Sequence, residues 1–119
     1  FIVTIGTDRY KRLRTDTTHT ARHLPIWNFA SIESFKQTMP VCCDLCAVEK
    51  DNRARCIKDF VHPPRAVYFY GPEEGKIPEL DYVSFRYKIR LPGSTCMNLS
   101  TAASIVMYDR WNKLHVTTF

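Results

Sequence analysis

The chain has 119 residues, of which 45% are hydrophobic and 13% aromatic, and it carries a formal net charge of +5. This apolar content excludes a disordered chain and is enough for one hydrophobic core, so we expect a single domain over residues 1–119. No apolar run approaches the ~20 residues that span a bilayer, and no signal peptide is recognisable, which predicts a cytoplasmic protein. The positive charge favours a polyanionic partner.

The first third of the chain predicts a strand and a short helix on either side of a basic segment. Phe1–Ile5 is apolar and β-branched, as is typical of a strand. The segment that follows concentrates positive charge at Lys11, Arg12 and Arg14, which makes it a candidate for contact with phosphates. Residues 23–29 are predicted to be irregular or extended, and Ser31–Lys36 is predicted to be a short helix capped by Ser31.

The middle of the chain predicts one strand and a long loop, and it holds most of the cysteines. Val41–Val48 is predicted to be a strand, and residues 49–64 a charged loop with a turn near residues 56–60. Cys43 and Cys46 have the C-x-x-C spacing of a zinc site, which Cys56 and His62 could complete. On a strand, however, Cys43 and Cys46 would face opposite sides, so we favour reduced, packed thiols.

The last third predicts two strands and a helix. Ala66–Tyr70 is an apolar run stopped by Gly71-Pro72, which indicates a buried strand. Phe85–Leu91 alternates apolar and basic residues, which suits a strand with one covered and one wet face. From Met97 to Leu114 the apolar residues recur every 3.6 positions, so we expect a helix with an apolar face toward the core, capped by Asn98 or Ser100.

Strands that alternate with helices predict an α/β fold, in which ligand-binding loops follow the carboxyl ends of the strands. Two motifs stand at such positions. One is Gly71-Pro72-Glu73-Glu74-Gly75-Lys76-Ile77-Pro78, and the other is Leu91-Pro92 followed by Asn98-Leu99-Ser100. Together they resemble the SPOUT superfamily of RNA methyltransferases, and within it the SpoU/TrmH group of 2′-O-ribose methyltransferases. Met97–Ser100 and Val106–Trp111 are most similar to the small members that methylate the ribose at the tRNA wobble position.

The resemblance implies a SPOUT-like sheet with flanking helices, a carboxy-terminal trefoil knot and S-adenosyl-L-methionine as cofactor. It also implies a homodimer formed through the last helix, near Tyr108, Trp111 and Leu114. The cofactor would be held largely by backbone groups of the loops that form the knot. Carried over position by position, the cofactor-binding residues are Ala47, Val48, Gly71, Leu91, Cys96 and Met97.

Methyl transfer to a ribose hydroxyl requires the donor carbon and the acceptor oxygen to be aligned and the hydroxyl proton to be lost. The resemblance assigns catalytic roles to Glu73 and Asn98, which would hold the acceptor site, and to Ser100, which would fix Asn98. Without the motifs, Glu73 would be a solvated turn carboxylate and Asn98 a plain helix cap. RNA, specifically tRNA, is the implied partner, with Lys11, Arg12 and Arg14 as contacts.

The family's first motif, Asn-x-Gly-x-x-x-Arg, has no counterpart in residues 1–30, and Phe1–Ile5 resembles the family's second strand. The chain would then lack the family's first strand and helix. A second hypothesis therefore stays open, in which the chain is a catalytically weakened SPOUT relative that binds RNA or a partner subunit. A third hypothesis, a zinc-binding nucleic-acid module, would need about one bound ion per chain.

Overall fold

The computed structural model describes residues 1–6, 22–72, 75–94 and 97–115. The chain divides into two compact units, Phe1–Val41 and Cys42–Phe119. Each unit contains parallel strands and at least one helix, which confirms the predicted α/β class.

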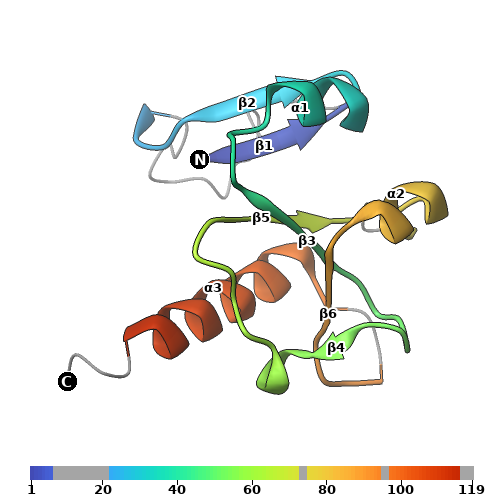
Figure 1. Ribbon diagram of the computed structural model, residues 1–119, viewed down its shortest axis with the longest axis vertical. Helices are drawn as coiled ribbons and strands as arrows, with labels where there is room; N and C mark the ends of the chain where they lie inside the picture. The colour runs from blue at the N-terminus through green and yellow to red at the C-terminus, as the bar shows by residue number, and fades with distance from the viewer. Residues whose placement is uncertain (7–21, 73–74, 95–96, 116–119) are drawn as a thin grey trace. The chain divides into compact units, whose positions relative to one another are not determined.

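The described residues of the first unit form strands β1 and β2 and helix α1 (Figure 1). Strands β1 (Ile2–Ile5) and β2 (Ile26–Phe29) pair in parallel, with Ile2 opposite Ile26. The strand expected at residues 1–5 is confirmed, and the extended stretch expected at residues 23–29 contains β2. Helix α1 (Ile32–Thr38) begins as predicted, because the Ser31 hydroxyl accepts a hydrogen bond from the Ser34 N–H at 3.2 Å.

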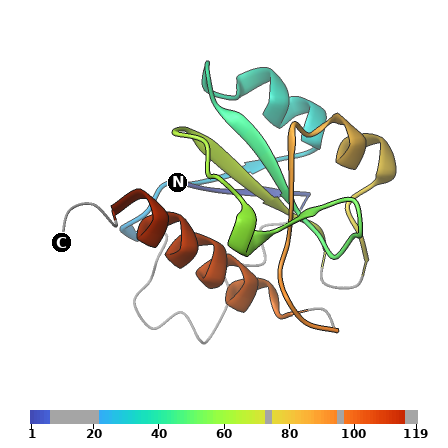
Figure 2. The same cartoon turned by 60° about the horizontal axis from the view of Figure 1, so that its bottom comes forward.

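In the second unit, the described residues form a four-stranded parallel sheet with the strand order β4-β6-β3-β5. Its elements in chain order are β3 (Asp44–Val48), β4 (Arg55–Cys56), a 3-10 turn at Ile57–Asp59, β5 (Ala66–Tyr70), α2 (Glu79–Ser84), β6 (Tyr87–Arg90) and α3 (Leu99–His115). The long helix α3, orange to red, lies beside the strands in both views (Figures 1 and 2).

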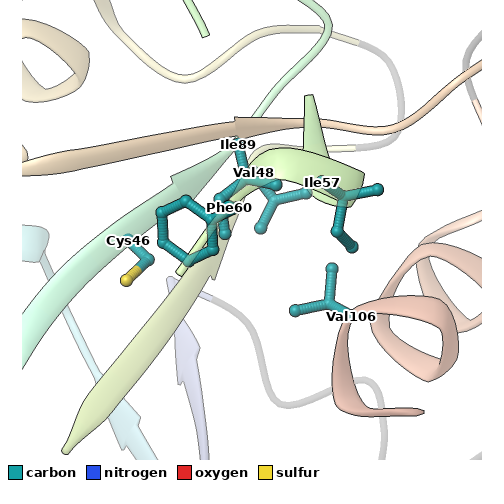
Figure 3. Close-up of a cluster of buried hydrophobic side chains, with 6 residues drawn as sticks. All are labelled: Cys46, Val48, Ile57, Phe60, Ile89 and Val106. Atoms are coloured by element: carbon teal, nitrogen blue, oxygen red, sulfur yellow. The ribbon is translucent and has the colours of Figure 1, made fainter. Parts of the chain in front are cut away.

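Most of the buried apolar side chains that the structure describes in this unit lie in two clusters, one for each helix that packs on the sheet. Val106 of α3 packs with Cys46, Val48, Ile57, Phe60 and Ile89, as Figure 3 shows. Tyr82 of α2 packs with Ala47, Ile77 and Phe85. Because neighbouring residues of a strand point to opposite faces, Cys46 and Val48 serve the first cluster and Ala47 the second. The sheet is therefore covered on both faces, as parallel sheets require.

Several predictions about elements need correction. The strand predicted over 41–48 begins only at Asp44, because Cys42 has a φ of +61° and the chain turns there. Ala66–Tyr70 has the predicted bounds but is half-buried, because β5 is an edge strand of the described sheet. The basic face of Phe85–Leu91 is not fully exposed to solvent, since Lys88 is half-buried and its Nζ lies 5.4 Å from the centre of the Tyr82 ring.

Helix α3 has the predicted extent but only part of the predicted packing. Ala102 and Val106 are buried, whereas Met107 and Trp111 are 56% and 46% exposed. The apolar residues thus wrap around the helix, and only one side of it meets the core.

Candidate active site

A pocket lies at the carboxyl ends of β3, β5 and β6. These three strands are parallel and adjacent, so their carboxyl ends meet at one edge of the sheet. Met97, just before α3, and Leu99, its first residue, close the pocket. Val48, Gly71, Leu91 and Met97, four of the residues predicted to hold a cofactor, are among its lining residues.

Gly71 lets two segments of the pocket wall approach closely. A Cβ atom built at this position would lie 3.0 Å from the backbone nitrogen of Ile77 and 3.2 Å from its Cγ1. Such a contact is tighter than most side chains make, so any residue other than glycine would require residues 76–77 to shift by a few tenths of an ångström. Packing around the pocket thus explains the glycine at the start of the Gly71–Pro78 motif.

Two charged residues that directly follow β3 position the loops of the pocket, and sequence reasoning missed both. Glu49 accepts a hydrogen bond from the Ile77 N–H through Oε2 at 2.9 Å. The Lys50 ammonium donates to the Ser94 carbonyl oxygen. Glu49 therefore holds the loop after β5, and Lys50 holds the loop after β6. The available signal was a charged pair at the end of a buried strand.

Asn98 caps helix α3, with Ser100 as its partner. The Asn98 Oδ1 accepts hydrogen bonds from the Ser100 N–H at 2.9 Å and from the Ser100 hydroxyl at 2.7 Å. These bonds fix the side-chain oxygen, while the Asn98 Nδ2 makes no hydrogen bond to any described residue. Of the two caps that the sequence allowed, the structure has Asn98.

The remaining predicted site residues do not line the pocket or lie outside the described residues. Ala47 is fully buried, and it packs with Ile77 and Tyr82 on the face covered by α2. Its side chain therefore faces α2, whereas that of Val48 faces the other side of the sheet, and the backbone contact with a cofactor predicted for Ala47 stays a prediction. The predicted residues Glu73, Cys96, Lys11, Arg12 and Arg14 lie outside the described residues.

A second polar cluster holds α3 against the sheet, away from the pocket. The buried His62 ring lies 2.6 Å through Nδ1 from the Tyr68 hydroxyl and 2.8 Å through Nε2 from Asp109 Oδ2. Arg110 donates to the Tyr68 hydroxyl at 3.0 Å, and Lys113 pairs with Asp109 at 2.8 Å. Burial, the largest cause, lowers the pKa of His62, although the hydrogen bond with Asp109 acts in the opposite direction.

The cysteines of the described chain are free thiols. These are Cys42, Cys43, Cys46 and Cys56, and no group of three or more potential metal ligands is found among the described residues. Burial raises the pKa of Cys46 to about 12, which keeps it a neutral, unreactive thiol. Cys46 thus behaves as a small apolar residue of the core.

None of the helices in the described part of the chain combines the length and the apolar character needed to cross a lipid bilayer.

Comparison with known proteins finds a relative by sequence and solved structures with a similar fold. The chain is 42% identical over 50 residues to the tRNA (cytidine(34)-2'-O)-methyltransferase of Saccharophagus degradans, a match that covers 38% of this chain and 32% of that protein. The chain thus spans about a third of the length of the curated relative that it matches. No protein-family model matches the chain.

A solved structure described as "Structural insights into the 2-OH methylation of C/U34 on tRNA" superposes with a TM-score of 0.68. The superposition covers 95% of this chain and 94% of that chain at 15% sequence identity. The structural match shows a shared fold, and the sequence match confirms the resemblance to the wobble-position 2′-O-methyltransferases that the two motifs predicted.

Proposed function

We propose that this chain is an S-adenosylmethionine-dependent methyltransferase that methylates the 2′-hydroxyl of a ribose in RNA, with tRNA as the substrate. One observation carries the proposal: the two motifs meet around a single pocket at the carboxyl edge of the sheet. The sequence relative, a tRNA 2'-O-methyltransferase, supports the same activity.

The lining of the pocket fits a nucleoside cofactor. Val48, Leu91 and Met97 supply an apolar wall, and Gly71 lets the segment at Ile77 pack closely against the end of β5 beside the pocket. We assign the binding of S-adenosylmethionine to these residues together with Ala47 and Cys96. When bound, the cofactor supplies a methyl group on a positively charged sulfur.

The polar residues of the two motifs would act on the RNA. Asn98, fixed through its Oδ1 by Ser100, has its Nδ2 available to donate a hydrogen bond to an oxygen of the acceptor nucleotide. We assign Glu73 to the acceptor site, where a carboxylate can orient the ribose hydroxyl. Lys11, Arg12 and Arg14, with the net charge of +5, are assigned to phosphate contacts.

The architecture that we propose is a single SPOUT-like domain over residues 1–119, with a carboxy-terminal trefoil knot and a homodimer through α3. The parallel sheet with a helix on each face supports a SPOUT-like domain. The exposed apolar residues Met107, Tyr108, Trp111 and Leu114 support a second copy on α3.

The test combines calorimetric titration with a transfer assay. The purified chain is titrated with S-adenosylhomocysteine, and then incubated with labelled S-adenosylmethionine and unmodified tRNA. We expect about one site per chain and label at a ribose 2′-oxygen. Cofactor binding without transfer would favour an RNA-binding or partner-binding relative, and a folded chain that binds no cofactor would overturn the proposal.

A further inference from the structure

One residue of the pocket wall, Tyr70, has a buried hydroxyl with no hydrogen-bond partner among the described residues. Tyr70 is the last residue of β5, directly before Gly71, and it lines the pocket. Its ring also packs against the core cluster that contains Val48 and Val106. The Tyr70 Oη is buried, and none of the described residues forms a hydrogen bond with it.

The neighbouring tyrosine on the same face of β5 shows how such a hydroxyl is normally satisfied. Tyr68 and Tyr70 are two residues apart on one strand, so their side chains share a face. The Tyr68 hydroxyl lies 2.6 Å from His62 Nδ1 and accepts a hydrogen bond from Arg110 at 3.0 Å. A buried hydroxyl without a partner costs free energy, so the Tyr70 hydroxyl is poised for a partner from outside the described chain.

We propose that the Tyr70 hydroxyl recognises the uncharged nucleoside part of the ligand in this pocket through a hydrogen bond. The inference rests on the proposed function and adds a specificity residue to it. The pocket wall around Tyr70 includes Val48, Leu91, Leu99 and Ala102, so a charged group would lose its hydration there without compensation.

Two further observations agree with this assignment. Burial raises the pKa of Tyr70, so the phenol stays neutral and keeps its proton for donation. The one cationic residue among the described pocket lining, Lys50, is exposed, which gives the charged amino-acid end of the ligand a solvated position instead.

Three tyrosine-to-phenylalanine variants test the inference. Tyr70→Phe removes the unpaired hydroxyl in the pocket. Tyr82→Phe is a matched control, because its hydroxyl is also buried without a partner but does not line the pocket. Tyr68→Phe removes a hydroxyl that is bonded inside the protein. For each variant we measure the thermal unfolding of the free protein. We then titrate it with S-adenosylhomocysteine and with 5′-methylthioadenosine, which lacks the charged amino-acid end.

We expect the free Tyr70→Phe protein to be at least as stable as wild type and to bind both compounds about fivefold to tenfold more weakly. Tyr82→Phe should bind like wild type, and Tyr68→Phe should melt at a lower temperature. A lower melting temperature of free Tyr70→Phe, or binding equal to wild type, would overturn the inference alone. A loss confined to S-adenosylhomocysteine would also overturn it. Failure of the wild type to bind either compound would overturn the proposed function and the inference with it.

Discussion

Asn98 combines a structural and a proposed catalytic role in one side chain, and the two roles use different atoms. Its Oδ1 caps α3 through Ser100, whereas its Nδ2 makes no hydrogen bond to the described residues. Asn98→Asp keeps an oxygen for the cap but loses the amide donor, because aspartate caps helices as well as asparagine does. Asn98→Ala loses both atoms.

We therefore expect Asn98→Asp to unfold like wild type in urea but to transfer methyl groups about 100-fold more slowly. Asn98→Ala should show the same loss of transfer and a free energy of unfolding lower by about 1 kcal/mol. Ser31→Ala, which removes the cap of α1, is the control for the loss of a cap alone and should transfer normally. An Asn98→Asp protein with normal transfer would refute the role of the amide.

In the Gly71–Pro78 motif, position 71 requires glycine for a steric reason. Gly71→Ala places a methyl group 3.0 Å from the Ile77 nitrogen, so residues 76–77 must move. We expect the free energy of unfolding to fall by about 1–3 kcal/mol and cofactor binding to weaken. The control is Gly75→Ala, where the nearest atom is a side-chain carbon of Pro72 at 3.4 Å. Equal urea midpoints for the two variants would contradict the steric explanation.

At the scale of elements, prediction from the sequence was most accurate where glycine and proline residues end a strand. The bounds of β5 were predicted because Gly71-Pro72 ends an apolar run. Strand β4 was missed because it has two residues and is held by its pairing with β6 rather than by a local pattern. Helix α2 was missed because its six residues follow Pro78 and are stabilised mainly by burial of Tyr82.

The same distinction holds for the candidate site. The family resemblance named Val48, Gly71, Leu91 and Met97, which lie near the carboxyl ends of parallel strands and line one pocket. Glu49, Lys50 and Tyr70 were missed. The charged pair at the end of a strand was visible in the sequence, but the roles of these residues depend on contacts, or missing contacts, between distant segments.

The loop before β5 is fastened to α3 through His62, which makes this contact sensitive to acid. Burial holds the pKa of His62 below the ordinary value of about 6.5 in the folded protein. Below pH 6.5 the unfolded chain takes up the proton more readily than the folded chain, so acid favours unfolding. Tyr68, Asp109, Arg110 and Lys113 face the ring, and Asp109 only partly offsets the effect of burial.

Above about pH 6.5, we expect protonation of His62 to have no effect on the free energy of unfolding of wild type. Below pH 6.5, we expect this free energy to fall. His62→Gln should be less stable at pH 8 and should lose less stability between pH 8 and pH 5 in urea titrations. His23→Gln, which changes an exposed histidine, should follow the wild-type pH profile. Parallel profiles for wild type and His62→Gln would show that another group is responsible.

At the scale of the whole molecule, the excess of positive charge should govern RNA binding. If Lys11, Arg12 and Arg14 each contact a phosphate, replacing all three with alanine removes three released counterions from the binding equilibrium. We expect the slope of log affinity against log salt concentration to become shallower by about 2–3. Replacing Lys58 and Lys36, which the RNA contacts do not include, is the control. An unchanged slope in the triple variant would place the contacts elsewhere.

The exposed apolar side of α3 should determine the oligomeric state. Met107, Trp111 and Leu114 recur at helical spacing on one side of α3, and Tyr108 adjoins them, with its ring 6.0 Å from that of Trp111. A solvent-exposed stripe of this kind is costly in a monomer, and a second copy of the same helix would cover it. Tryptophan near the centre of an interface commonly dominates the binding energy.

We therefore expect sedimentation velocity to show a dimer for wild type and, for Trp111→Glu, a dimer dissociation constant raised by about 30-fold or more. Leu80→Glu is the matched control, because Leu80 on α2 is 86% exposed but lies outside the stripe on α3, and this variant should remain dimeric. A monomeric wild type would contradict the dimer. Dissociation of both variants would instead indicate non-specific association, because only a defined interface distinguishes one exposed apolar residue from the other.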